Sequence, residues 1–208
     1  MKASIKIMSI IALLGIIGAF ICFIPVTKEH NSVSSTLHAG SAKVNVTPDT
    51  PIPMSGYGNR SEAFKGVHDS LYVTATVFSD GSGKSAIITA DLIGFSHSLC
   101  DEIIQKIEKT TGIKKDFILL SANHNHGGPR NKAYGDEALP EVEKYVVELQ
   151  QNIVNAVVQA NEKLQPAMIG MGKGTCNMNI NRRAKFADGS IWLGRNPDGP
   201  CDHDVSVV

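Results

Sequence analysis

Two histidines separated by one residue are the strongest candidates for chemistry in this sequence. His124 and His126 lie in the stretch Ser121–Pro129 (SANHNHGGP), directly after the apolar run Phe117–Leu120. In extended backbone, side chains two residues apart project to the same side, so the two imidazoles can share a metal ion or divide the roles of metal ligand and proton carrier. The alternative is that both are solvated loop residues. The strand expected before them and the Gly-Gly-Pro after them favour a site, because α/β proteins bind ligands at the carboxyl ends of strands.

Three further groups carry residue types that could complete such a site. Asp91 follows the expected strand Ser85–Ala90, where a carboxylate can orient a histidine through its second ring nitrogen or cap the following turn. Arg182 lies in the run Asn179–Arg183 (NINRR), where a guanidinium can clamp a carboxylate or stabilise an oxyanion, although paired arginines also occur on solvated faces. His68 precedes an expected strand, and a lone histidine in that position is usually structural.

The composition excludes several classes of protein. Twenty basic residues balance twenty acidic ones, so no overall positive field is available and nucleic acid is not expected as a partner. The 42% hydrophobic content excludes disorder as the main state, and 208 residues suit one domain. The 4 cysteines show no C-x-x-C spacing, so neither a zinc knuckle nor a disulfide framework is predicted. Cys100 and Cys176 are expected to be buried as small hydrophobic residues.

The N-terminal segment indicates export or anchoring. Lys2 and Lys6 precede the uncharged apolar run Ile7–Val26, which is long enough to cross a hydrocarbon core of ~30 Å as a helix. Residues 1–26 are therefore predicted to be a signal anchor or, alternatively, a cleaved signal peptide. The lysines should stay in the cytoplasm, so the domain is expected outside it, held at the membrane or secreted after cleavage. The polar residues 27–38 are predicted to be a linker.

Residues 39–208 predict an α/β domain. Strands and helices alternate, which favours a layered domain with a mixed β-sheet flanked by helices. Helices are expected at 97–110 and at 140–164, where a proline opens the helix and apolar residues recur at spacings of four and three. A turn at 80–83 should join two strands into a hairpin. Strands are expected at 42–46, 67–79, 84–90, 117–120, 167–172, 191–193 and 205–208. The last of these reaches the end of the chain, so the domain is expected to be incomplete there.

The order of these segments resembles the N-terminal portion of the neutral, non-lysosomal ceramidase family. The resemblance covers about residues 38–208, and the histidine block is its most specific part. The matching segments are Ala39–Pro48 (AGSAKVNVTP), Met54–Asn59 (MSGYGN), Gly66–Asp69 (GVHD), Thr89–Asp91 (TAD), Leu120–Pro129 (LSANHNHGGP) and Asn179–Arg182 (NINR).

The resemblance implies a zinc-dependent hydrolysis of a lipid amide, in which N-acylsphingosine (ceramide) gives a sphingoid base and a fatty acid. By the family pattern His124 is the zinc ligand, His126 is its hydrogen-bonding or proton-handling partner, and Arg182 lies near the scissile group. We expect the Asp91 carboxylate to orient a histidine of the site through the ring nitrogen that does not bind the metal. The family's remaining ligands, a second histidine, a glutamate and a tyrosine, come from further along, so they are expected beyond Val208. The 208 residues alone are then expected to be inactive.

Two departures from the family keep other functions open. Asn125 and Gly127 stand where family members usually carry threonine and serine. These changes favour a related metallohydrolase that acts on a different amide or ester. A further alternative is a non-catalytic, membrane-tethered binding domain in which the histidines are vestigial.

Overall fold

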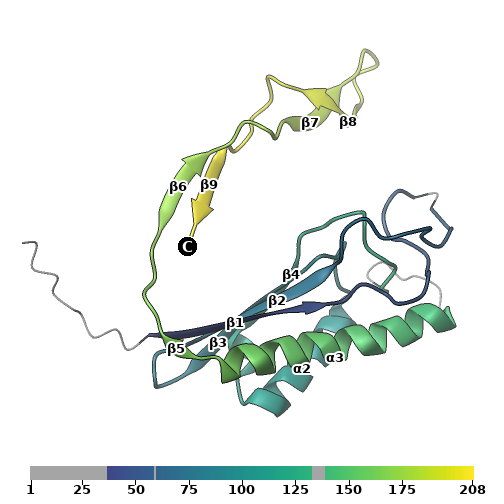
Figure 1. Ribbon diagram of the computed structural model, residues 1–208. Coiled ribbons are helices and arrows are strands. Elements are labelled where there is room, and N and C mark those ends of the chain that lie inside the picture. Colours follow the sequence, from purple (N-terminus) through teal and green to yellow (C-terminus); the bar gives the residue numbers. More distant parts are fainter. Residues whose placement is uncertain (1–36, 59, 133–138) are drawn as a thin grey trace, which may run out of the picture. The chain divides into compact units, whose positions relative to one another are not determined.

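The fold is that of a computed structural model, which describes residues 37–58, 60–132 and 139–208. These residues form a five-stranded sheet with two helices, followed by two separate two-stranded ladders (Figure 1). The predicted membrane segment 1–26 lies outside the described residues, as does nearly all of the predicted linker. No helix within the described ranges is long and apolar enough to span a membrane.

The sheet is mixed, as the sequence predicts. Its strand order is β4-β3-β2-β1-β5, with β3 and β4 parallel and the other neighbours antiparallel. Its strands are β1 (His38–Asn45), β2 (Tyr72–Ser79), β3 (Lys84–Ala90), β4 (Ile118–Ala122) and the two-residue β5 (Gln165–Pro166). Because β3 and β4 run in the same direction, the segments that follow them leave the sheet at the same edge.

The β2–β3 hairpin is confirmed, although β2 begins later than expected. Asp80 closes the turn by accepting hydrogen bonds from the backbone N–H groups of Ser82 and Gly83, both at 2.8 Å. The ladder between β1 and β2 stops at the pair Asn45–Tyr72, because β1 ends there and leaves residues 67–71 without a partner strand. The expected strand 67–79 is therefore shortened to 72–79.

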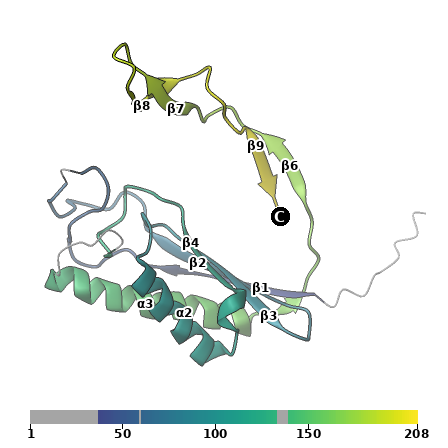
Figure 2. The same cartoon turned by 180° about the vertical axis from the view of Figure 1, so that it is seen from behind.

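Helices α2 (His97–Thr111) and α3 (Pro140–Glu162) cover one face of the sheet (Figures 1 and 2). Both helices were expected at nearly these bounds: Ser96 caps α2 by accepting from the N–H of Leu99, and Pro140 opens α3. The core lies between the helices and the sheet. Its fully buried side chains include Val73, Val77, Ile88, Ile103, Ile107, Leu149 and Ile153. The alternate residues of the strands face away from the helices, and Ile87 and Leu119 are exposed there.

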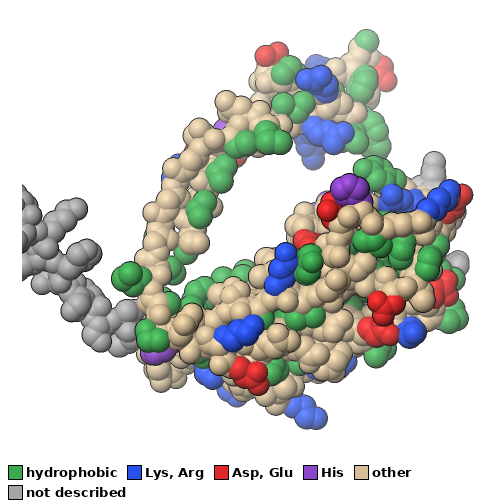
Figure 3. Space-filling view, in the orientation of Figure 1, with side chains coloured by type: hydrophobic (Ala, Val, Ile, Leu, Met, Phe, Trp, Pro, Cys, Tyr) green, Lys and Arg blue, Asp and Glu red, His purple; other side chains and the backbone are tan. Residues whose placement is uncertain are grey.

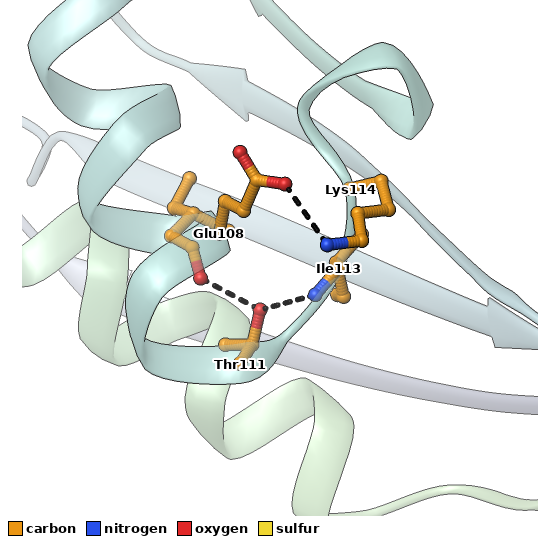
Figure 4. A network of polar contacts seen from close by, with 5 residues as sticks. Glu108, Thr111, Ile113 and Lys114 are labelled. Atoms are coloured by element: carbon orange, nitrogen blue, oxygen red, sulfur yellow. Dashed lines mark hydrogen bonds and ion pairs between the residues drawn. The ribbon is translucent and has the colours of Figure 1, made fainter.

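The end of α2 fixes the path of the chain into β4. Gly112 adopts a φ of 75° and donates its N–H to the carbonyl of Glu108 at 2.9 Å, which ends the helix. Figure 4 shows the surrounding contacts: the Thr111 hydroxyl donates to Ile107 O at 2.8 Å and accepts from Ile113 N at 3.3 Å, and Lys114 lies 3.5 Å from Glu108. A short 3-10 turn η2 (Lys115–Phe117) then leads directly into β4. This connection sets β4 parallel to β3.

A hydrogen bond between Tyr145 and Val46 should stabilise the join between α3 and the end of β1. The Tyr145 side chain is buried, its hydroxyl donates to Val46 O at 3.0 Å, and burial raises the pKa of the phenol. Replacement Tyr145→Phe leaves that carbonyl without its donor, so we expect the free energy of unfolding to fall by about 1–3 kcal/mol. Urea denaturation measures the change. Tyr72→Phe, at a half-buried tyrosine whose ring lies under Lys43, is the control and should change stability little.

The strands after α3 differ most from the prediction. The ladders pair β6 (Gly172–Thr175) with β9 (Asp204–Val207), and β7 (Asn181–Lys185) with β8 (Ile191–Asn196). The expected strand 167–172 is wrong, because among the described residues 167–171 belong to no strand and the ladder with β9 begins only at Gly172. Strand β7 was not predicted, since its run of cations hides the alternation that normally indicates a strand. Cys100 and Cys176 are only half-buried, so their expected burial is also wrong.

Candidate functional site

The candidate site begins where β3 and β4 end side by side. Asp91 follows β3 and Asn123 follows β4, and the Asp91 carboxylate accepts from the Asn123 side-chain amide at 2.7 Å. The other carboxylate oxygen accepts from the backbone N–H of Tyr72 at 2.9 Å, at the start of β2. Asn123 N also donates to Ala90 O at 3.1 Å. The loop that carries the histidines is thus tied to the sheet at its first residue.

His124 has one ring nitrogen fixed and the other available. Its Nδ1 lies 2.8 Å from the carbonyl oxygen of Ile93. Because a carbonyl only accepts, Nδ1 carries the proton and Nε2 keeps its lone pair in the neutral ring. Histidines that bind metals usually have this arrangement, with the second nitrogen bonded to a carbonyl or carboxylate. His124 is itself exposed.

The backbone at His124 is not extended as expected. Its φ of 56° lies in the left-handed region, which non-glycine residues rarely adopt. The ring of His126 nevertheless lies beside it, with centroids 5.3 Å apart and planes inclined by 66°. The prediction of adjacent imidazoles is confirmed, although the turn at His124, and not an extended chain, places them together.

Gly56 brings the long loop after β1 onto His126. The Tyr57 ring meets the His126 ring edge to face, with centroids 4.8 Å apart at 84°. Gly56 has a φ of 78°, and a Cβ on it would lie 2.4 Å from Cγ of His126. Only glycine fits both the conformation and the space.

Two backbone hydrogen bonds and the side chain of one arginine hold this loop against the histidine block. Ser55 N donates to Gly128 O at 3.0 Å, and Arg130 N donates to Pro53 O at 2.8 Å. The Arg60 guanidinium donates to His126 O at 2.7 Å and to Ser55 O at 3.2 Å. His126 is therefore fixed through both its ring and its backbone.

The histidines and the loop together line a hollow of about 350 Å³. Arg60 and Arg130 belong to the lining, and none of its described residues carries a carboxylate. Such a lining suits an electron-rich oxygen, for example a carbonyl or a carboxylate. The lining residues are Met54, Ser55, Gly56, Tyr57, Gly58, Arg60, Ile93, His124, His126 and Arg130.

A buried asparagine supports the segment that orients His124. The side chain of Asn131 is fully buried and donates to Gly94 O at 2.8 Å, next to the Ile93 carbonyl that binds the His124 ring. Its Oδ1 is buried without a partner among the described residues. The Ile93–Gly94 segment is thereby fixed on both sides.

A larger hollow of about 900 Å³ lies around the turn 80–83, near Phe78 and Phe117. It sits at the opposite ends of β2 and β3 from the histidines. No histidine or cysteine of the described residues lines it. The smaller hollow is the candidate site, because it contains two adjacent histidines, whereas the Asp80 carboxylate in the larger one is used to close the turn 80–83.

The other sequence-predicted residues are placed differently. Asp91 bonds Asn123, one residue from His124, and within the described residues its carboxylate contacts no histidine. Arg182 lies exposed on β7, and no hydrogen bond or ion pair joins it to the histidine loop in the described part of the chain. His68 is almost fully exposed and pairs with Asp69 at 2.8 Å. The structure thus brings His124 and His126 together and places Asp91 just behind them.

Sequence reasoning missed four residues of the site: Tyr57, Arg60, Ile93 and Asn131. Tyr57 belongs to the segment MSGYGN, whose paired glycines around an aromatic residue were a usable signal. Ile93 acts through its backbone carbonyl, which leaves no mark on the sequence. Arg60 and Asn131 act through single contacts that appear only after the loops are placed.

The histidines are the right type of residue to bind zinc, but the described residues supply too few ligands for a complete zinc site. Imidazole nitrogen is a preferred zinc ligand, and a catalytic zinc usually takes three protein ligands. Within the described residues, no group of three or more His, Cys, Asp or Glu side chains is arranged to hold a metal ion. His124, with its free Nε2, is the ligand that this part of the chain offers most clearly.

The fold and the site define a mixed-sheet α/β domain that carries a histidine pair at the carboxyl ends of its parallel strands. The chain matches the family model "Neutral/alkaline non-lysosomal ceramidase, N-terminal" over residues 38–187. It therefore belongs to the neutral/alkaline non-lysosomal ceramidase family and corresponds to the N-terminal part of that family, which confirms the resemblance seen in the sequence.

Individual relatives agree with this assignment. The chain is 30% identical over 195 residues to neutral ceramidase A of Dictyostelium discoideum, covering 88% of the chain and 27% of the relative. It is 27% identical over 173 residues to neutral ceramidase of Drosophila melanogaster, covering 79% of the chain and 25% of the relative. The chain thus spans about a quarter of the length of these relatives.

Solved structures show the same fold. A ceramidase complexed with C2 aligns with a TM-score of 0.60 at 21% identity, over 71% of this chain and 24% of that chain. The neutral ceramidase from Pseudomonas aeruginosa aligns with a TM-score of 0.59 at 20% identity, over 71% of this chain and 25% of that one. The predicted mixed α/β architecture is confirmed.

Proposed function

We propose that the natural polypeptide carrying residues 1–208 is a zinc-dependent amide hydrolase that cleaves N-acylsphingosine to a sphingoid base and a fatty acid. Family membership supports the reaction class. The observation that carries the proposal is the His124 ring, whose Nδ1 is held by Ile93 O at 2.8 Å and whose Nε2 is left free for a metal.

His124 would hold the metal in this proposal. A bound zinc ion would polarise the amide carbonyl and lower the pKa of its water, so that hydroxide is available near neutral pH. Ile93 fixes the orientation of the His124 ring, and Asn131 fixes the segment that carries Ile93. The other ligands are proposed to come from beyond residue 208, in the part of the family's chain that these residues do not span.

His126 is proposed as the residue that handles protons. Its ring is oriented by Tyr57 and His124, and within the described residues neither ring nitrogen has a hydrogen-bond partner. A free, oriented imidazole beside a metal ligand can take a proton from the attacking water and pass it to the leaving amine nitrogen.

Arg182 and Asp91 have supporting roles in the proposal. Arg182 matches the family's arginine near the scissile group, where a guanidinium would stabilise the developing oxyanion. Asp91 is proposed as a positioning residue: it holds Asn123, the residue next to His124. Residues 1–26 are proposed to anchor the domain outside the cytoplasm, or to direct its secretion if they are cleaved.

The contacts of Asn125 weaken the argument for a different amide or ester as substrate. Its side-chain amide donates to Asn123 Oδ1 at 2.8 Å, and its Oδ1 accepts from Gly127 N at 3.0 Å. Both ends of the Asn125 side chain are thus occupied within the loop. The departure from the family at this position shapes the loop and leaves little of the side chain to select a substrate.

Matched substrates test the proposal. We expect the natural polypeptide to release fatty acid from a ceramide and to leave the corresponding simple fatty amide and fatty ester largely intact. Mass spectrometry of the released fatty acid measures each reaction. Preferential cleavage of the ester or the simple amide would support the related metallohydrolase, and binding of ceramide without cleavage would support the non-catalytic domain.

A further inference from the structure

The β7–β8 hairpin presents large apolar side chains to solvent. Trp192 is 75% exposed, Leu193 62%, Ile191 59% and Phe186 47%. Three of these residues are consecutive in β8, so apolar groups stand on both sides of the ladder. A shallow groove of about 550 Å³ lies along the hairpin, lined by Asn181, Arg182, Arg183, Ile191, Trp192 and Leu193.

The same hairpin is strongly cationic. Residues 181–196 hold four cations, Arg182, Arg183, Lys185 and Arg195, against the single carboxylate of Asp188, a net charge of +3 in a chain whose total net charge is 0. Asp188 is used locally, because its carboxylate accepts from both the N–H and the hydroxyl of Ser190. Among the described residues, none of the four cations takes part in an ion pair.

The strand register places two of the apolar side chains of β8 beside cations of β7. Lys185 pairs with Ile191, and Arg183 pairs with Leu193. Between them Trp192 pairs with Ala184, so it emerges on the opposite side with little to cover it. Figure 3 shows Lys and Arg side chains gathered among hydrophobic ones over the β7–β8 hairpin.

We infer that the β7–β8 hairpin binds the surface of an anionic lipid bilayer. Tryptophan and the long stems of arginine and lysine are suited to the boundary between headgroups and acyl chains, where one end of the side chain is apolar and the other hydrated. The net positive charge complements anionic headgroups. Ile191 and Leu193 are the reason to choose a bilayer and not a soluble polyanion, because aliphatic groups need an apolar phase to enter.

The inference deepens the proposed function and rests on it in one respect. A lipid amide resides in a bilayer, so a protein that cleaves it must work at that surface. The hairpin also carries Arg182, the residue proposed to act near the scissile group. If the hairpin contacts the membrane, Arg182 would lie at the same depth in the bilayer as the amide bond of the lipid substrate.

Trp192 is the only tryptophan among residues 1–208, and the difference in emission between the full polypeptide and its Trp192→Phe variant separates its fluorescence from that of any other tryptophan. We expect the full polypeptide, mixed with vesicles of phosphatidylcholine and phosphatidylserine, to show a blue shift of Trp192 emission and quenching by brominated acyl chains. Both effects should weaken in pure phosphatidylcholine and at about 1 M salt, where charge attraction is screened. The apolar segment 7–26 is present in the protein under all of these conditions, so it cannot account for a difference between anionic and neutral vesicles.

Charge reversal provides the matched control. The double variant Arg183→Glu/Lys185→Glu keeps Trp192 and should lose most of the blue shift and quenching with anionic vesicles. The variant Lys109→Glu/Lys163→Glu makes the same change of net charge at exposed residues outside the hairpin and should behave as the unmodified protein. Equal loss in both variants would mean that overall charge, and not the hairpin, drives the contact, and would overturn the inference.

Two further results would overturn it. Trp192 emission that stays at the solvent-exposed wavelength on protein that floats with the vesicles would show that the hairpin does not touch the bilayer. Emission already blue-shifted without vesicles would show that protein covers the hairpin, from a second copy if the shift depends on concentration and from the same chain if it does not. Ceramide cleavage in detergent is measured separately, so insertion of Trp192 without cleavage would leave this inference standing and remove the proposed function.

Discussion

His124→Ala should abolish both zinc retention and ceramide hydrolysis in the natural polypeptide. The substitution removes a ring nitrogen, Nε2, that is oriented for a metal by the hydrogen bond of Nδ1 to Ile93 O and has no partner among the described residues. Loss of a catalytic metal removes several kcal/mol of transition-state stabilisation, which corresponds to a fall in rate of about 10³-fold or more. Zinc content by atomic emission and fatty acid release from ceramide measure the two effects.

His68→Ala is the matched control for this prediction. His68 is the same residue type in the same polypeptide, but it is exposed and, among the described residues, its ring pairs with the neighbouring Asp69 and not with the site. We expect this variant to keep its zinc and its turnover. Unchanged turnover in His124→Ala would refute the assignment of the metal ligand, whatever the control shows.

The second large effect is expected from Gly56→Ala. A methyl group at this position would meet Cγ of His126 at 2.4 Å, and the φ of 78° is unfavourable for alanine. We expect the free energy of unfolding to fall by about 1–3 kcal/mol, because the loop must either strain or move away from the ring. Ceramide turnover should fall further than stability alone explains, since His126 loses the contact that orients its ring. Urea denaturation and turnover of the folded variant measure the two effects.

Gly58→Ala separates this effect from a general response of the loop. Gly58 lies two residues further along, a Cβ there would meet nothing within 4 Å, and its φ is not in the left-handed region. We expect near-normal stability and turnover. If Gly56→Ala behaved like Gly58→Ala, the close approach of the loop to His126 would not exist in solution.

The sequence was a good guide where local pattern and packing agree. The segment from β3 through α2 to β4 was predicted with bounds within two residues, because an alternating strand, a helix ended by glycine and a compact apolar strand each carry a strong local signal. The same agreement located the histidine block at the end of β4. Its neighbour in space, Asp91, was found for the same reason.

Contacts between distant segments could not be predicted. The approach of Gly56 to His126 joins residues 70 positions apart and depends on the path of a long loop without secondary structure. The Ile93 carbonyl that orients His124 is a backbone group, and any residue type could supply it. Strand β7 escaped prediction because pairing with β8, and not an apolar pattern, makes it a strand. The first two of these features, at Gly56 and Ile93, organise the two adjacent histidines into a site.

The central claim is that the histidine pair belongs to a zinc-dependent ceramide hydrolase. The most direct measurement is ceramide turnover by the natural polypeptide before chelation, after removal of its metal, and after return of zinc. We predict that the isolated protein contains zinc in stoichiometric amount, loses fatty acid release on chelation and regains it with zinc. Full turnover of ceramide by the metal-free protein would contradict the account.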